Sequence, residues 1–248
     1  MNIGIALLAA AAGYLFGSIS WARIITGLVA PGTDISMIRE PVPHTDEVFE
    51  SDSVSATTVR IHVGTRYGCL TAILDMLKVA LPTLAFKLWL PDTPYFLLVA
   101  AMGVVGHDWP LFFKFKGGRG ESPILGGLIV IDLIGLVVTN VLGFALGVLA
   151  GNILVLRWAG LVLLIPWMWL RFHDWAYVAY MAFVNVIYWI AMTPDLKQYF
   201  QFKDAAIDPT QEELAEFLGM GARLGRLLDR YSLPALWSRL RRRDRSDT

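Results

Sequence analysis

Residues 3–28 read IGIALLAAAAGYLFGSISWARIITGL, an apolar run whose only charged residue is Arg23 near its end. A helix needs about 20 mostly apolar residues to cross the hydrocarbon core of a bilayer. No basic segment precedes the run, and no A-x-A cleavage site stands at the right distance behind it. We therefore interpret residues 3–28 as a retained transmembrane span rather than a cleaved signal peptide.

The composition of the chain agrees with a membrane protein. Hydrophobic residues make up 56% of the 248 residues and charged residues 17%, and the mean hydropathy is +0.55. An average soluble domain is roughly 45–50% apolar and about 25% charged, so a soluble enzyme or a disordered chain is excluded. The 21 basic and 21 acidic residues cancel, and no nucleic-acid partner is expected. The single cysteine, Cys69, cannot form an internal disulfide.

Further apolar runs follow along the chain. We expect seven spans, at residues 3–28, 69–90, 95–113, 124–139, 141–156, 158–170 and 175–192. The fourth and fifth spans have almost no gap, which predicts a tight turn around Thr139 and Asn140. The predicted fold class is an all-α polytopic membrane protein with about seven transmembrane helices.

The positions of the basic residues predict the orientation. They gather in residues 31–68, in residues 114–119, at Arg157 between the fifth and sixth spans, and in the carboxyl-terminal tail. With seven spans, all four positions fall on one side. Loops rich in Lys and Arg stay in the cytoplasm, so we expect the amino terminus outside and the carboxyl terminus inside.

Two regions are expected on this basis. Residues 1–192 form the membrane domain, including a cytoplasmic loop at 31–68 with an acidic insertion at 46–52, and residues 193–248 form a cytoplasmic tail. The tail contains a capping box at Thr210 and Glu213, then leucines at helical spacing with interleaved arginines, ending in an arginine run at 241–243. Such a helix predicts binding to anionic membrane lipids, with packing against a partner helix as the alternative.

Ionisable residues inside a span are costly and are functional candidates by default. Asp75 and Lys78 lie three positions apart in the second span, on one face of the helix. One interpretation is a buried ion pair that holds helices together. The other is a charged wall of a polar cavity at the cytoplasmic end.

Residues 107–120 are the strongest local signal for a ligand site. Gly117, Gly118 and Gly120 permit close backbone approach, and successive N–H groups there can bind an anion. Arg119 adds a guanidinium suited to phosphate, and a helix from Pro123 onward would place its amino terminus beside the same anion. A basic cytoplasmic turn is the alternative. For Gly17 and Ser18 in the first span, helix packing is the favoured interpretation.

These motifs, in this order, resemble the acyl-phosphate-dependent glycerol-3-phosphate acyltransferase family (PlsY type) of bacterial inner membranes. The matching segments are Gly17-Ser18-Ile19-Ser20, Asp75-x-x-Lys78, His107-x-x-Pro110 and Phe115-Lys-Gly-Gly-Arg-Gly120. The sequence departs from the family pattern at Ser36, at Glu50-Ser51-Asp52-Ser53 and at Arg119, where the family has Arg, Gly-Ser-Gly-Asn and Lys. The family's late histidine and asparagine have no counterpart that we can identify.

The resemblance implies a reaction and a set of roles. A fatty acyl group would pass from acyl phosphate to the 1-hydroxyl of glycerol 3-phosphate, giving lysophosphatidic acid and phosphate, with no cofactor and no metal. The enzyme would be a multi-pass protein of the bacterial inner membrane. The implied site comprises N–H groups of Gly117, Gly118 and Gly120, His107 as a donor or loop anchor, the phosphate ligands Arg119, Lys78, Arg60, Arg66 and Ser18, and Asp75 to orient Lys78.

Other functions stay open at this point. The changed acceptor motifs permit acyl transfer to another acceptor, or a non-catalytic relative that binds acyl phosphate or lipid as a regulator or scaffold. A small-solute or ion transporter is a third class, since Asp75, Lys78 and His107 could line a path. The sequence carries no inverted repeat of the kind that transporters show.

Overall fold

The computed structural model describes residues 2–41, 48–204, 210–217, 220, 222–235 and 237. The described part is mainly helical, with one two-stranded antiparallel hairpin. In chain order the elements are α1 (Ile3–Gly17), α2 (Trp21–Val29), β1 (Ile38–Pro41), β2 (Val48–Ser51), α3 (Ala56–His62), α4 (Thr65–Trp89), α5 (Tyr95–Asp108), the short 3-10 helix η1 (Leu111–Phe113), α6 (Glu121–Ala150), α7 (Ile153–Phe172), α8 (Trp175–Asp204), α9 (Gln211–Phe217) and α10 (Ala222–Tyr231).

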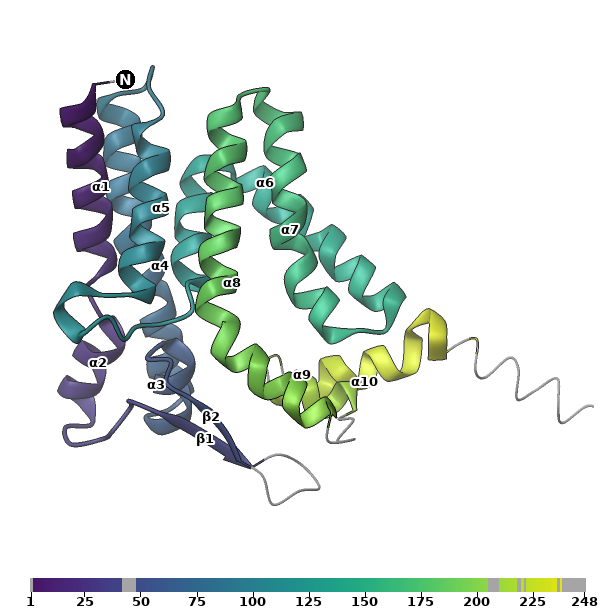
Figure 1. Ribbon diagram of the computed structural model, residues 1–248. Coiled ribbons are helices and arrows are strands. Elements are labelled where there is room, and N and C mark those ends of the chain that lie inside the picture. Colours follow the sequence, from purple (N-terminus) through teal and green to yellow (C-terminus); the bar gives the residue numbers. More distant parts are fainter. Residues whose placement is uncertain are drawn as a thin grey trace, which may run out of the picture.

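Within the described residues, six segments are long and apolar enough to cross a membrane. The first, Ile3–Val29, joins α1 and α2, and the others are α4, α5 with η1, α6, α7 and most of α8. This confirms the prediction of a multi-pass helical membrane protein. Figure 1 shows the start of α1 and the end of α8 at opposite edges of the bundle. Which edge faces the cytoplasm stays a prediction.

α6 combines the predicted fourth and fifth spans, and it breaks at Asp132, whose φ of −156° and ψ of 86° are not helical. Glu121 and Asn140 nevertheless line one small crevice. In a straight helix they would be about 28 Å apart, so the two arms of α6 fold back on each other. The predicted turn at Thr139 and Asn140 was therefore wrong, because both residues lie inside the second arm.

Buried polar groups hold this break. The Asp132 carboxylate accepts a 2.7 Å hydrogen bond from the indole of Trp167 and lies 4.0 Å from Arg171. Lys87 of α4 donates to the Val130 carbonyl at 2.6 Å, close to where the helical hydrogen bonds stop. The next turn of the chain lies at Gly151 and Asn152, where the Asn152 side chain caps α7. Arg157 is thus within α7, not between two spans as predicted.

Small residues bring α1 and α5 into close contact. A Cβ at Gly13, Gly17 or Gly106 would overlap backbone atoms of the facing helix, which supports the packing interpretation of Gly17. The main core lies between α4, α5, α6, α7 and α8, and includes Val79, Val104, Leu128 and Leu164. This packing fixes the lower ends of the helices, where the site lies.

The predicted cytoplasmic segments gather at one edge. The β1–β2 hairpin, α3 and α9 lie in the lower part of Figure 1, and the loop at 109–120 lies above α2 and α3 at the left. The hairpin was not predicted, and the flanking loop 42–47, including acidic positions 46 and 47, lies outside the described residues. α8 continues past residue 192 to Asp204, so the tail begins as an extension of a membrane helix. The division into two regions at 192 stays a prediction.

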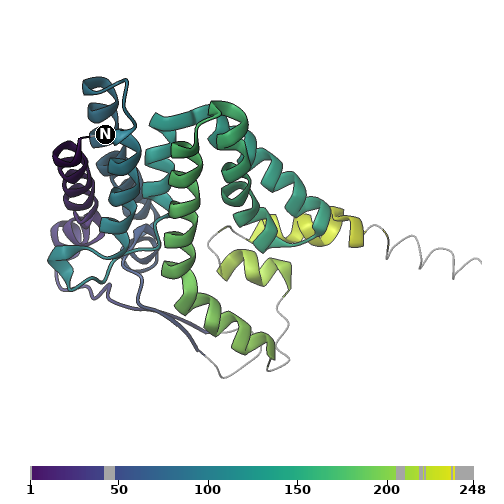
Figure 2. The ribbon, with the colours of Figure 1, turned by 45° about the horizontal axis from the view of Figure 1, so that its top comes forward.

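The tail packs against the turn that joins the end of α6 to the start of α7, as Figure 2 shows. Thr210 and Glu213 form the predicted capping box, with reciprocal hydrogen bonds of 2.8 and 3.2 Å. Leu214 and Leu228 bury against Ile153 and Leu156. One face of α10 is thus occupied by this chain's own helices. The arginine run at 241–243 lies outside the described residues.

Candidate functional site

The loop between α5 and α6 is held by α1 and α2 from one side. Tyr14 donates to the Trp109 carbonyl at 3.0 Å, and the Ser18 hydroxyl accepts from the Leu111 N–H at 3.3 Å. Arg23 donates to the Lys116 carbonyl at 2.9 Å. Ser18 is fully buried. Its hydroxyl therefore holds the loop in place and is not open to a ligand.

His107 and the glycines that follow form a close backbone contact. The Gly118 N–H donates to the His107 carbonyl at 3.1 Å. A Cβ at Gly118 would overlap Nε2 of the imidazole, and a Cβ at Gly117 would overlap the His107 carbonyl. The glycines are therefore required by the packing of His107. The Gly118 N–H is already bonded, so it is not a free donor to a ligand.

Lys78 is the centre of a buried polar cluster. Its ammonium lies 2.8 Å from the Asp75 carboxylate, 2.7 Å from the Ile19 carbonyl and 2.9 Å from Nδ1 of His107. The contacts with the Ile19 carbonyl and with Nδ1 of His107 are hydrogen bonds, and the contact with Asp75 is an ion pair. The structure supports the ion-pair interpretation: Asp75 orients Lys78, and Lys78 orients the imidazole through Nδ1.

Lys78→Met is expected to destabilise the protein. The side chains of Asp75 and Lys78 are only 3% and 2% exposed, and breaking a buried pair costs about 3–5 kcal/mol because one charge is left alone. The midpoint of thermal unfolding in detergent should fall by roughly 10 °C. Lys114→Met, at an exposed position, is the control and should change little. Adding Asp75→Asn to Lys78→Met should recover part of the lost stability. An unfolding midpoint equal to that of the wild type, together with a higher KM for the acceptor, would instead favour a ligand role for Lys78.

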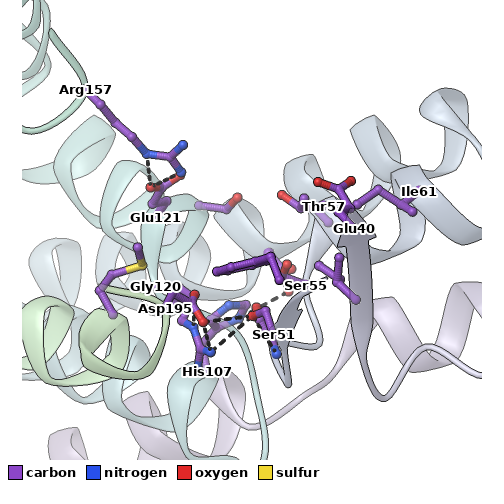
Figure 3. Close-up of a pocket in the computed structure, with 18 residues that line it drawn as sticks. Glu40, Ser51, Ser55, Thr57, Ile61, His107, Gly120, Glu121, Arg157 and Asp195 are labelled. Atoms are coloured by element: carbon purple, nitrogen blue, oxygen red, sulfur yellow. Dashed lines mark hydrogen bonds and ion pairs between the residues drawn. The ribbon is translucent and has the colours of Figure 1, made fainter. Parts of the chain in front are cut away.

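A cavity of about 140 Å³ lies in front of this cluster. Figure 3 shows Gly120 and Asp195 side by side above His107, with Ser51 and Ser55 across from them. α6 begins at Glu121, two residues earlier than predicted, and Gly120 at φ 81° is its N-cap without a side-chain cap. The N–H groups of Arg119, Gly120, Glu121 and Ser122 donate to no other described residue. A helix start with free N–H groups favours an anion.

Arg119 reaches the same cavity, and carboxylates bind its Nε and one of its two terminal nitrogens. It donates to Asp195 through Nε at 2.9 Å and through one terminal nitrogen at 2.8 Å, and to Asp52 at 3.0 Å. Burial alone lowers the pKa of the Arg119 guanidinium, but the hydrogen bonds and charges of Asp195 and Asp52 outweigh it and raise the pKa. Arg119 is therefore a permanent cation that two carboxylates compensate.

Arg157 and Glu121 form the opposite wall of the cavity. Arg157 donates to Glu121 at 2.9 and 2.5 Å, and Tyr188 donates to the same carboxylate oxygen at 2.8 Å. Behind this pair an apolar crevice of about 150 Å³ runs between the arms of α6, α7 and α8. Glu121 and Arg157 line both the crevice and the cavity. The two spaces therefore meet at this ion pair.

The structure brings together only some of the residues expected at the site. His107, Asp75, Arg119 and Gly120 line the cavity, whereas Ser18, Lys78 and Gly117 line a much smaller space behind it. Arg60 and Arg66 are exposed on α3 and α4 and line neither space, so their assignment as phosphate ligands receives no support. Among the described residues, no cluster of three or more His, Cys, Asp or Glu side chains could hold a metal ion.

Sequence reasoning missed Asp195 and Ser51. Ser51 donates to Asp195 at 3.0 Å, which ties β2 to α8 at the cavity mouth. The signal available for Asp195 was an acid directly after Pro194, at the end of an apolar run. A second signal was the departure at Glu50-Ser51-Asp52-Ser53, which places acids where the family has small and neutral residues. Neither signal shows by itself that the two segments meet at Arg119.

Comparison with known proteins gives consistent results. A family model described as glycerol-3-phosphate acyltransferase matches residues 7–201. Proteins named glycerol-3-phosphate acyltransferase from Mesoplasma florum and Aquifex aeolicus are each 35% identical, over 51% and 46% of this chain and 47% and 53% of theirs. The chain thus spans about half the length of these curated relatives.

A solved structure shares the fold. A crystal structure of PlsY, an integral membrane glycerol 3-phosphate acyltransferase, in its lysophosphatidic acid form superposes with a TM-score of 0.63 at 20% identity. The superposition covers 79% of this chain and 92% of that one. Because the family model spans most of the chain, from α1 into the end of α8, the chain belongs to the glycerol-3-phosphate acyltransferase family.

Proposed function

We propose that this protein transfers a fatty acyl group from acyl phosphate to the 1-hydroxyl of glycerol 3-phosphate. The observation that carries the proposal is the convergence, in a chain of this family, of Arg119, the Gly120 turn and the uncapped start of α6 on one cavity. These groups are the kind that bind phosphate and stabilise a developing oxyanion.

The chemistry needs little more than positioning. The acceptor hydroxyl attacks the acyl carbonyl, a new ester C–O bond forms, and the bond between the acyl carbon and the phosphate oxygen breaks. The leaving phosphate carries away the electron pair and takes up the hydroxyl proton, so no side chain has to act as nucleophile. Holding the two substrates in line is then the main task of the protein.

Each part of the site has a proposed task. Arg119 binds a substrate phosphate, and the N–H groups at Gly120 and the start of α6 stabilise negative charge on the phosphate or the carbonyl oxygen. His107, held by Lys78 and Asp75, keeps the glycine loop in place. Gly117 and Gly118 serve through close packing on His107, which differs from their expected role as N–H donors.

The apolar crevice is the proposed seat of the acyl chain. It is lined by Leu125, Leu128, Leu136, Leu161 and Leu164 and meets the cavity at Arg157. Binding here places an acyl carbonyl beside the uncapped start of α6, with the chain among apolar side chains.

Leu161→Trp should therefore shift the preference of the enzyme toward shorter acyl chains. The indole would fill part of the 150 Å³ crevice, and each excluded CH₂ of substrate forfeits about 0.8 kcal/mol of burial. We expect kcat/KM for a C16 acyl phosphate to fall at least tenfold, with a much smaller loss for a C8 donor. Val162→Trp, at a neighbouring exposed position on α7, is the matched control. Equal losses for both chain lengths would count against this seat.

The acceptor is tested by comparing phosphate release with different hydroxyl compounds. Purified protein in lipid nanodiscs would receive acyl phosphate with glycerol 3-phosphate, glycerol, or no acceptor. We expect release only with glycerol 3-phosphate, because glycerol lacks the phosphate that Arg119 binds. Faster release with glycerol than with glycerol 3-phosphate would indicate another acceptor and refute this part of the proposal.

The tail is proposed to bind anionic lipids of a bacterial inner membrane. Leu227, Tyr231 and Leu233 are more than half exposed, and Arg223, Arg226 and Arg230 lie on the same helix. An amphipathic helix with this composition suits the surface of an anionic bilayer. The buried face of α10 is used by α9 and α7, so the exposed apolar face is the one available to lipid.

An environment-sensitive dye can be attached to the cysteine of a Leu233→Cys variant in which Cys69→Ser removes the native thiol. We expect the dye to emit at a shorter wavelength in anionic nanodiscs than in zwitterionic nanodiscs. The shift should weaken with added salt, which screens exposed charges. Replacing Arg223, Arg226 and Arg230 by Gln is the control and should remove the difference between the lipids. Identical emission in both lipids would contradict lipid binding by the tail.

A further inference from the structure

The segment that crosses the cavity mouth is held on both sides. On the α8 side, the Glu50 N–H donates to Gln198 at 3.0 Å and Gln198 donates back to the Glu50 carbonyl at 2.5 Å. On the side of the glycine loop, the Val54 N–H donates to the Gly117 carbonyl at 2.8 Å. Residues 50–54 therefore form a strap between α8 and the glycine loop.

The strap places the carboxylate of Asp52 against the guanidinium of Arg119, which is the group proposed to bind substrate phosphate. Asp52 lies 3.0 Å from Arg119, and Asp195 binds the same guanidinium through both of its oxygens. The other acid of the strap, Glu50, is turned away to Arg39 at 2.9 Å. One acid of the strap and one acid of α8 thus meet at Arg119.

The charges around the cavity do not favour an anion as they stand. The lining includes two guanidinium groups, of Arg119 and Arg157, and four carboxylates, of Glu40, Asp75, Glu121 and Asp195. Each guanidinium is paired with a carboxylate, and the buried ammonium of Lys78 behind the cavity is paired with Asp75. A phosphate that enters this lining needs a cation that a carboxylate now occupies.

Phosphate and carboxylate compete for Arg in the same geometry. Both accept two parallel N–H bonds from a guanidinium fork, and the Asp195 contact with Nε and a terminal nitrogen is such a fork. A phosphate dianion offers more charge and one more oxygen than a carboxylate. We therefore expect a phosphate ester dianion to displace the carboxylate more readily than a monoanion of similar size.

We propose that Asp195, assisted by Asp52, is a specificity-determining residue that competes with the substrate phosphate for Arg119. The two carboxylates both bind Arg119. A phosphate dianion displaces Asp195, and the hydrogen bond from Ser51 of the strap to Asp195 is then lost. This inference rests on the proposed binding of phosphate at Arg119, but it does not require that acyl transfer follow.

The test measures binding of inorganic phosphate and of glycerol 3-phosphate to the full-length protein in nanodiscs, by calorimetry and without acyl donor. Asp195→Asn keeps the size of the side chain and removes the competing charge. We expect it to bind phosphate about tenfold tighter than the wild type, since charge-assisted forks are among the strong hydrogen bonds. Asp52→Asn should give a smaller gain because Asp52 is half exposed.

Two controls make the result specific. Asp92→Asn removes an equal charge from the exposed α4–α5 connection and should leave phosphate affinity unchanged. Arg119→Gln should abolish the gain that Asp195→Asn gives when the two are combined. Thermal unfolding of each variant verifies that it is folded before binding is measured.

The sign of the change decides between the alternatives. Unchanged or weaker phosphate binding by Asp195→Asn would overturn the inference, because Asp195 would then support Arg119 or have no part in binding. A gain that persists with Arg119→Gln would also overturn it, as a general charge effect. If the binding pattern holds but the wild type transfers no acyl group, the proposed reaction fails while the competition at Arg119 stands.

Discussion

Arg119→Gln is expected to lower kcat/KM for acyl transfer by about 10²–10³-fold, the loss typical when a preorganised charge stabiliser is removed. Two arginines, Arg119 and Arg157, are among the described residues that line the cavity, and Arg119 is the one in the glycine loop. Gln keeps some hydrogen bonding but loses the charge and the fork. The measurement is lysophosphatidic acid formation by protein in nanodiscs, at several concentrations of glycerol 3-phosphate.

The control for Arg119 is Arg66, another arginine that the sequence offered as a phosphate ligand. Arg66 is exposed and lines neither the cavity nor the small space behind it, so Arg66→Gln should change kcat/KM less than about threefold, as expected for a surface substitution. Arg119→Lys keeps the charge and should retain most of the activity. Comparable losses for Arg66→Gln and Arg119→Gln would contradict the position of the site.

Gly118→Ala should reduce activity at least 100-fold while the membrane helices stay folded. A Cβ at Gly118 overlaps Nε2 of His107, so the imidazole or the loop has to move. The His107 ring also contacts Lys78 at 2.9 Å, and a shift there carries through to the buried cluster. A displacement of about 1 Å at a positioning group is enough to cost 10²-fold in rate.

Gly27→Ala is the matched control for Gly118→Ala. Gly27 is also a glycine, lies in α2 and has nothing within 4 Å of an added Cβ. Alanine is favoured over glycine in a helix by roughly 1 kcal/mol, so this variant should be active and no less stable. Circular dichroism and thermal unfolding would confirm the fold of both. Activity of Gly118→Ala near that of the wild type would refute the role of the loop.

The sequence predicted the membrane fold well because its signals are local. The runs beginning at Ile3 and Trp175 are each long enough to cross a bilayer, and they fold as α1 with α2 and as α8. The predicted turn between the fourth and fifth spans was wrong for a physical reason. Thr139 and Asn140 resemble turn residues but bond back to carbonyls four positions earlier within the helix. The break lies instead at Asp132, a buried acid whose partners Trp167 and Arg171 come from a distant segment.

The site was predictable in part. The glycine loop, His107 and the Asp75–Lys78 pair are each signalled by residues close in sequence, and they meet as expected. The partner of Arg119 was not predictable, because Asp195 lies 76 positions away and belongs to the last long helix. Asp52 comes from a hairpin that no periodic pattern indicated. Pairing over such separations depends on how α8 and the hairpin dock, which composition and spacing do not specify.

The most direct test of this account is the formation of lysophosphatidic acid from acyl phosphate and glycerol 3-phosphate by the purified protein in nanodiscs. We predict saturable product formation with one phosphate released per lysophosphatidic acid, and almost no product with Arg119→Gln. No product from the folded wild type, under conditions in which another member of the family turns over, would contradict it.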